Sequence, residues 1–434
     1  RLLRFVLPCI GTMLFTSIYG IVDGLCVSNF VGKTAFAAVN LIMPLPMLLG
    51  TIGFMLGTGG SAIVGITLGE GDQKKADRYF TLFLLAALVS VSVLAVLGIV
   101  FLRPIAVLLG AKGELLDYAV RYGRILMVSL PTFALQNMFQ SFFVTAEKPH
   151  LGFWFTVGAG CTNMVLDVLM VGIWGWGVEG AAIATFISQL VGGVLPVFYF
   201  IDRSNSSRLH LCKTSFYSKV LRDACINGSS ELMTNLSMSL VNILYNYQLL
   251  RLAGENGVAA YGVIMYAAFL FVAVFVGYAV GSAPIVSFHY GARNHAEVHN
   301  LYRKSLRLIA VVAVTLTLAS MFIIPCVARI FVGYDAELLA LTSRAFRLYA
   351  LSFLIMGFNV YASSFFTALG DGVTSALISF LRTLAFQVIA ILLLPLLLGI
   401  DGIWLAVTAA ELAALAVSAA MLLTKDKVFH YRKA

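Results

Sequence analysis

Two aspartates interrupt otherwise apolar stretches in the first half of the chain. Asp23 is the single charged residue between Phe5 and Val31, and Asp167 lies within GCTNMVLDVLMVG (160–172). An ionised carboxylate in apolar surroundings is strongly unfavourable unless a proton, a cation or hydrogen-bond donors compensate for it. Such residues therefore indicate a site at which charge is bound or switched.

Other polar residues lie at helical spacing from these aspartates. Tyr19 precedes Asp23 by four residues and Asn163 precedes Asp167 by four, so each pair shares one helix face. Two desolvated carboxyl groups near each other either share a proton or bind a cation such as Na⁺ between their oxygens. Both alternatives remain open, Asp23 and Asp167 being the metal ligands in the second, and no other cofactor is expected. Further members expected around the pair are Thr185, Asn137 and Gln140.

The second half of the chain carries its own buried polar set. A basic residue and two acidic residues each fall near the middle of an apolar stretch: Glu231, Arg382 and Glu411. An arginine beside glutamates favours a neutralised structural pair, and the alternative is a second cation or substrate site. Four tyrosines could line an aromatic cavity for lipophilic cations or pack in the core, namely Tyr245, Tyr247, Tyr261 and Tyr266.

Motifs for enzymatic chemistry are weak. GTGGSAIVG (57–65) lacks the G-K-[ST] ending of a phosphate loop and lies in an apolar stretch, so close helix packing is the better interpretation. His295 and His299 are four residues apart in a charged loop, which favours a solvated face over a metal site. We expect no enzyme and no nucleic-acid partner.

Composition places these residues in a membrane. The chain of 434 residues is 60% hydrophobic and only 11% charged, whereas soluble domains carry about a quarter charged residues. A bilayer needs about 20 apolar residues per helix. That rule predicts twelve spans near 5–30, 36–68, 78–102, 117–146, 151–174, 178–201, 222–250, 257–290, 300–327, 336–368, 373–398 and 402–424.

Basic residues predict the orientation of these spans. Lys and Arg are about twice as frequent at the termini and after even-numbered spans as on the opposite face. Both termini are therefore expected in the cytoplasm, in a multi-pass protein of the inner cell membrane that contacts membrane lipids and is a monomer.

The chain also repeats itself at one gapless offset of 222 residues. At this offset VGKTAFAAVNLIM (31–43) aligns with AGENGVAAYGVIM (253–265), and IVGITLG (63–69) aligns with IVSFHYG (285–291). Each half holds six spans, so the halves share one orientation. At the same offset Asp23 meets Tyr245 and Asp167 meets Ile389, which indicates that the acidic site is functional and belongs to one half only.

The expected fold is an all-α integral membrane protein. Its twelve transmembrane helices form two six-helix bundles related by a pseudo-two-fold axis along the membrane normal, with a central cavity between them. The expected organisation is an N-lobe (1–206, spans 1–6), a cytoplasmic linker (207–221) that could form an amphipathic helix, and a C-lobe (222–434, spans 7–12).

The sequence resembles the multidrug and toxic compound extrusion (MATE) family, in its prokaryotic DNA-damage-inducible-type branch. The resemblance covers essentially the whole chain. It rests on LLRFVLPCI, IYGIVDGL, GKTAFAAVNLIMPL, GEGDQKKA, AEKPH, NMVLD, GVEGAAIAT and GIWLAVTAAE. It implies two six-helix lobes around a V-shaped cavity, and export of organic cations in exchange for H⁺ or Na⁺.

The resemblance also implies roles for individual residues. The residues that look like the family's N-lobe cation site are Asp23, Asn163, Asp167 and Thr185, with Tyr19, Asn137 and Gln140 as neighbours. Pro8 resembles the first-helix proline whose bending accompanies protonation of the site. One departure is that Gly357 to Phe366 holds no acid, unlike the tenth span of some relatives, although Glu231 resembles another part of their C-lobe site.

The expected function is therefore secondary active multidrug export by alternating access. The alternative is a lipid-linked oligosaccharide flippase of the same superfamily, which would need Arg and Lys in the cavity for a pyrophosphate headgroup. A channel or receptor is a further class, which the two-lobed repeat with its asymmetric acidic site argues against.

Overall fold

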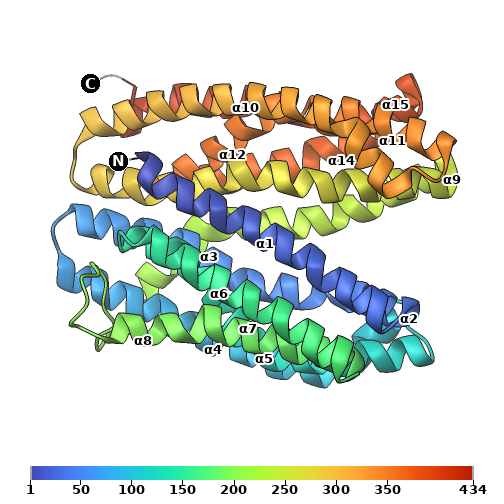
Figure 1. Cartoon of the computed structure of the whole chain (residues 1–434). Helices are drawn as coiled ribbons and strands as arrows, with labels where there is room; N and C mark the ends of the chain where they lie inside the picture. Colours follow the sequence, from blue (N-terminus) through green and yellow to red (C-terminus); the bar gives the residue numbers. More distant parts are fainter. Residues whose placement is uncertain (1, 433–434) are drawn as a thin grey trace.

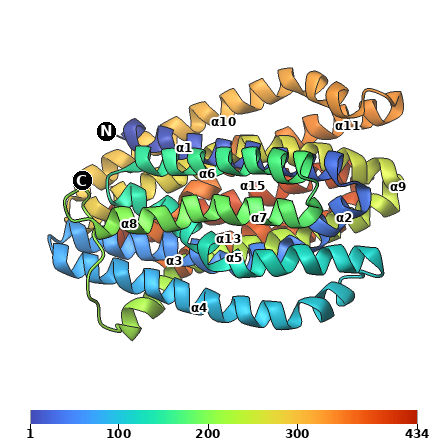
Figure 2. The same ribbon diagram turned by 60° about the horizontal axis from the view of Figure 1, so that its bottom comes forward.

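The computed structural model describes residues 2–432, except for the side chains of Leu25, Ser28 and Lys33, and this part is helical without a strand. Two bundles lie side by side: residues 2–201 form the lower one in Figure 1 and residues 218–432 the upper one. We call them the N-lobe and the C-lobe. The long helices share one common direction, and both chain ends lie at the same end of the molecule (Figures 1 and 2).

The N-lobe contains six spans. Its elements are α1 (Leu2–Phe30), α2 (Lys33–Ile42), α3 (Pro44–Gly69), α4 (Gln73–Leu108), α5 (Glu114–Thr145), α6 (Pro149–Asp167), the π-helical η1 (Val168–Ile173), α7 (Gly177–Gln189), the π-helical η2 (Leu190–Val194) and α8 (Leu195–Ile201). Two of these spans are composite, since η1 continues α6 while η2 and α8 continue α7. The second span is divided into α2 and α3 just before Pro44, at the N-terminal position that proline favours in a helix.

The C-lobe repeats this plan with different breaks. Its elements are α9 (Ser218–Gly291), α10 (His295–Val332), α11 (Ala336–Ala350), α12 (Phe353–Ala368), α13 (Gly372–Phe380), the π-helical η3 (Leu381–Ala385), α14 (Phe386–Leu398), α15 (Ile400–Thr424) and the short α16 (Asp426–Phe429). The 74 residues of α9 comprise two helices joined at Gly254, whose backbone is not helical. α11 and α12 form one span bent by 45°.

Twelve spans follow from these breaks, as the sequence predicts. Among the described residues nine helices are long and apolar enough to cross a bilayer, and the bent pair α11 and α12 makes a tenth. Division of α9 at Gly254 gives the eleventh. The twelfth is α5, in which Gln136, Asn137 and Gln140 lower the mean hydropathy although residues 125–145 carry no charge.

Turn geometry reproduces the internal repeat. Gly32 and Gly254 have positive φ angles of 120° and 64°, and Gly177 and Gly399 have 65° and 63°. Members of each pair are related by the offset found in the sequence, and glycine adopts this backbone region without a steric penalty. The same connections therefore end the same spans in both lobes.

The two lobes meet mainly where α1 and α3 pack against α9. A Cβ atom on Gly59 would lie 2.1 Å from the carbonyl oxygen of Ala224, and one on Gly228 would lie 1.9 Å from that of Met55. Only glycine allows backbones to approach this closely. The glycine-rich stretch 57–65 thus serves helix packing, as predicted, and not phosphate binding.

The linker differs from one prediction. Residues 202–217 form no helix, and only Ser218–Leu221 of the predicted amphipathic segment are helical, as the first turn of α9. The linker instead runs along α4, where the His210 amide donates to Asp77 and the Cys212 amide donates to Thr81. Because these side chains satisfy its backbone, the segment needs no helical hydrogen bonds.

Candidate functional site

The structure brings the two N-lobe aspartates together. Asp23 lies on α1 and Asp167 ends α6, each about 30 Å along its helix from the end of the molecule that holds the chain termini. Their carboxyl groups lie within hydrogen-bonding range of each other. Asp23 is 8% exposed and Asp167 is fully buried. Two carboxyl groups in this position repel each other unless a proton or a cation lies between them.

Among the described residues, no basic group neutralises this pair. Within the described part of the chain, no Lys, Arg or His forms an ion pair with either aspartate. No N–H or hydroxyl group donates to Oδ1 of Asp23 or to either oxygen of Asp167. The described residues therefore supply no counter-charge for the pair.

Asn163 lies one helical turn before Asp167 on α6 and contacts Thr185 of α7. The Asn163 amide donates to the Thr185 hydroxyl at 3.4 Å, and this hydroxyl donates to the Ala181 carbonyl at 3.0 Å. The Oδ1 of Asn163 is buried and has no partner, so it remains free to accept a proton donor or ligate a cation. Asp167 directly precedes η1, and such π-helical turns are common at functional sites.

Tyr19 connects the aspartates to α5. Its ring lies near Asp23, and its hydroxyl interacts with the side chain of Gln136. A Cβ atom on Gly160 would lie 2.8 Å from the Tyr19 ring, so this glycine leaves room for the phenol against α6. Sequence reasoning favoured Asn137 and Gln140 but missed Gln136, which is the residue that contacts Tyr19.

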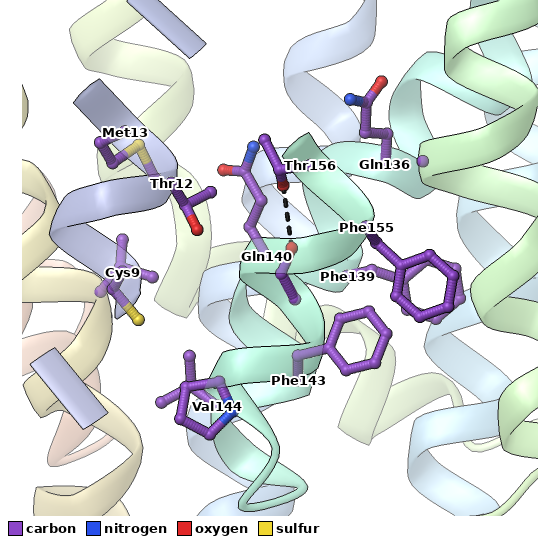
Figure 3. Close-up of a pocket in the computed structure, with 14 residues that line it drawn as sticks. Cys9, Thr12, Met13, Gln136, Phe139, Gln140, Phe143, Val144, Phe155 and Thr156 are labelled. Carbon is purple, nitrogen blue, oxygen red and sulfur yellow. Dashed lines mark hydrogen bonds between the residues drawn. The ribbon is translucent and has the colours of Figure 1, made fainter. Parts of the chain in front are cut away.

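A small cavity of about 20 Å³ lies between α1, α5 and α6 (Figure 3). Gln140 reaches into it beside Thr12 and Thr156, and Gln136 lies at its edge. This volume holds about one water molecule. Thr12 is three helical turns before Asp23, so Gln140 lies roughly 16 Å along α1 from the carboxyl pair. The cavity thus extends the polar region from Gln136 toward the end of the molecule that holds the chain termini.

Two further residues surround the pair and were not singled out from the sequence. Tyr122, which is fully buried, and Cys26 both lie close enough to interact electrostatically with both carboxyl groups. Tyr122 stands between Arg121 and Arg124 on a different helix, and this context gives no sequence signal of the proximity. Pro8 lies inside the unbroken α1, where its carbonyl accepts the Thr12 hydroxyl at 2.9 Å.

The C-lobe polar set is arranged differently. Nη1 of Arg382, on η3, donates to Oε1 of Glu411 at 3.1 Å. Glu411 is fully buried on α15, and its Oε2 accepts the Asn359 amide at 2.7 Å. Ser418 in turn donates to Oδ1 of Asn359 at 2.9 Å. The C-lobe set thus contains an ion pair, which the described surroundings of Asp23 and Asp167 lack.

A cavity of about 490 Å³ lies between the lobes. The N-lobe contributes residues of α3 and α5 to its wall, but the C-lobe contributes most of the lining and all of its charged residues, namely Glu231, Arg382 and Glu411. Asp23 and Asp167 do not line it. Tyr245 and Tyr261 stack at 5.0 Å in its wall, whereas Tyr247 and Tyr266 are 64% and 44% exposed on the outer surface.

Comparison with known proteins begins with the repeat. A family model described as MatE matches the chain twice, over residues 8–169 and 232–393. The chain belongs to the MatE family. Membership confirms the family expected from the sequence and identifies a transporter rather than an enzyme. Assignment to the DNA-damage-inducible branch stays a prediction.

MatE relatives cover nearly the whole chain. Multidrug export protein MepA of Staphylococcus saprophyticus is 21% identical over 433 residues, with 98% of this chain and 94% of the relative covered. MepA of Staphylococcus aureus strain MSSA476 is 21% identical over 429 residues, with the same shares covered.

Solved MatE structures share the fold. An outward-facing multidrug resistance transporter of the MATE family superimposes with a TM-score of 0.93 at 23% identity, over 100% of this chain and 96% of that one. A transporter of the same superfamily from Pyrococcus furiosus, described as having a binding pocket of reversed polarity, gives 0.92 at 22% identity, again over 100% and 96%. These structures support the two-bundle architecture with twelve helices.

Proposed function

We propose that this MatE protein is a multidrug exporter that antiports organic cations or amphiphilic drugs against H⁺ or Na⁺ by alternating access. The observation that carries the proposal is the buried, uncompensated pair of Asp23 and Asp167. A site that lacks its counter-charge binds an external cation. The relatives named multidrug export proteins support drugs as the other substrate.

The transport cycle follows from one rule, that coupling ion and drug compete for the N-lobe. From the outer side, H⁺ or Na⁺ neutralises Asp23 and Asp167, α1 bends near Pro8, and the drug leaves. On the inner side the ion dissociates, the carboxylates regain their charge, and drug binds again. Asn163 and Thr185 orient the site by their mutual hydrogen bond.

The energy of one coupling ion suffices for export. One charge that crosses 100 mV releases about 2.3 kcal/mol, and one pH unit adds about 1.4 kcal/mol. One proton per drug molecule therefore supports accumulation of roughly tenfold to several hundredfold.

The basic residues support the orientation of the protein in the membrane. Both termini lie in the cytoplasm in this proposal, in a monomer of the inner cell membrane that contacts membrane lipids. Both termini lie at the same end of the molecule, which agrees with an even number of spans. The flippase alternative is not favoured, because the described lining of the central cavity holds one arginine and two glutamates rather than a basic surface.

Efflux of ethidium from proteoliposomes with an imposed ΔpH or ΔpNa tests the proposal. We expect one gradient to drive efflux by the wild type and Asp167→Asn to abolish it. Asp117→Asn is the matched control, since it makes the same chemical change at an exposed position.

Each result has a defined meaning. The gradient that drives wild-type efflux names the coupling ion. Unchanged efflux by Asp167→Asn would contradict the N-lobe site, and absence of wild-type efflux under both gradients would reject drug export.

A further inference from the structure

The central cavity has donor groups that no protein acceptor uses. Arg382 lines the cavity, and its side chain is 12% exposed. Glu411 accepts a hydrogen bond from Nη1 of Arg382, whereas Nε of Arg382 is buried without a partner. Tyr245 lies in the same wall, 2% exposed, and its hydroxyl also lacks a partner. Buried donors that remain unpaired are unfavourable, so both groups favour a ligand with an acceptor oxygen.

The surroundings of these donors suit an aromatic body. Tyr245 stacks on Tyr261 with an angle of 14° between the rings, and Tyr349, Phe269 and Val272 line the same cavity. The volume of about 490 Å³ is in the range of sites for drug-sized ligands. An apolar wall with a few convergent polar groups fixes the orientation of such a ligand.

Glu231 adds an acidic side chain to the cavity. It lies on α9 and lines the cavity, and no cation in the described part of the chain forms an ion pair with it. Glu411, by contrast, is shared between Arg382 and Asn359. Glu231 therefore adds an acidic group to the cavity within electrostatic range of Arg382, while Nε of Arg382 and the hydroxyl of Tyr245 keep donors for an acceptor.

We propose that the C-lobe wall of the central cavity is a subsite for the carboxylate of an amphiphilic aromatic ligand, with Arg382 and Tyr245 as its donors. The inference rests on the proposed drug export and deepens it. Arginine is suited to this role because its guanidinium can hold two carboxylates at once through separate N–H groups. The subsite selects an acid over its ester.

A matched pair of dyes tests this selectivity. Rhodamine 123 is the methyl ester of rhodamine 110, so the two share one cationic aromatic body and differ in the carboxylate. We expect the purified full-length protein in nanodiscs to bind rhodamine 110 about tenfold more tightly by fluorescence polarisation, since charge-assisted hydrogen bonds are the stronger ones.

Two variants assign the effect to the donors. Tyr245→Phe removes only the hydroxyl and keeps the stack on Tyr261, so it should weaken rhodamine 110 binding several-fold and leave rhodamine 123 within twofold. The double variant Arg382→Gln/Glu411→Gln removes the guanidinium together with the carboxylate that it pairs with, and should abolish the preference for the acid.

Other outcomes overturn the proposal. Three results would show that water or the protein alone satisfies these donors. They are equal or tighter binding of rhodamine 123, equal weakening of both dyes by Tyr245→Phe, and no binding of either dye. Ethidium efflux by the same preparation separates the two proposals: efflux without acid selectivity rejects only the subsite, and absence of efflux rejects drug export.

Discussion

The two lobes share one fold and solve the problem of buried charge in opposite ways. In the N-lobe, Asp23 and Asp167 face each other without a cation from the described residues. In the C-lobe, Arg382 neutralises Glu411 at 3.1 Å. The described residues supply no counter-charge in the first arrangement, whereas in the second an arginine of the protein neutralises the buried glutamate.

Equivalent positions show how the repeat diverged. Gln189 and Asn137 of the N-lobe correspond to Glu411 and Asn359 of the C-lobe at the offset of 222 residues. In the C-lobe these two residues are hydrogen-bonded, whereas Oε1 of Gln189 and Nδ2 of Asn137 are buried without partners. An amide in place of a carboxylate thus removes the need for an arginine.

The arginine itself occupies a position that differs in size between the lobes. Arg382 corresponds to Gly160, and a Cβ atom at Gly160 would lie 2.3 Å from the Phe15 ring. The N-lobe therefore has no room for a long side chain there, because aromatic rings of α1 fill the space. The comparison teaches that one scaffold holds two carboxyl groups without a described counter-charge in one lobe and an ion-paired carboxylate in the other.

Loss of the arginine should have the largest effect on stability. Arg382→Gln leaves fully buried Glu411 without its cation, so we expect the free energy of unfolding to fall by about 3–5 kcal/mol. The double variant Arg382→Gln/Glu411→Gln should recover most of this loss. Thermal unfolding in detergent measures both, and a single variant as stable as the double one would show that the C-lobe pair is not self-contained.

Neutralisation of an N-lobe aspartate should affect transport strongly and stability little. Asp167→Asn removes a repulsive buried carboxyl, so stability should stay equal or rise, while gradient-driven efflux falls at least about 100-fold, equivalent to about 2.7 kcal/mol. Efflux and thermal unfolding of one preparation give both values. A large loss of stability would instead indicate that the N-lobe pair is structural.

The turns before the sixth and twelfth spans should respond alike. Gly177 and Gly399 have nearly the same positive φ, and no atom lies within 3.4 Å of an added Cβ at either position. Gly177→Ala and Gly399→Ala should therefore each lower stability by about 1 kcal/mol through backbone strain alone. Effects that differ by more than twofold would show that the two turns are not equivalent.

Helix caps give the smallest expected effect. The Asp72 side chain accepts the Lys75 amide, and at the equivalent position Asn294 accepts the Glu297 amide. Asp72→Ala and Asn294→Ala should each lower stability by about 0.5–1 kcal/mol. Asp117→Ala, an exposed change inside the first turn of α5, serves as a reference. A cap variant that loses no more stability than this reference would show that the two caps are not equivalent.

Much of the fold was predictable because the bilayer constrains it. Apolar stretches of sufficient length identified the spans, and the offset of 222 residues identified two equivalent halves. The linker helix was predicted wrongly, because its amphipathic pattern gives no account of the hydrogen bonds that Asp77 and Thr81 of α4 accept from the linker amides.

The site was predictable in its members more than in its contacts. Helical spacing placed Tyr19 with Asp23 and Asn163 with Asp167. It did not distinguish Gln136, which contacts Tyr19, from Gln140, which reaches into the small cavity between α1, α5 and α6. Residues four positions apart share a helix face, but the rotation of that face toward a neighbour depends on packing.

The sequence by itself determined which segments cross the membrane, that they form two repeats, and that the acids of the N-lobe have no counterpart in the C-lobe. These properties follow from composition and chain order, which need no spatial information. Only the tertiary structure decided that Asp23 meets Asp167, that Arg382 pairs with Glu411, and that Glu231 lines the central cavity. The reason is that such contacts depend on how helices are rotated and which become neighbours, and these are set by packing of the whole bundle.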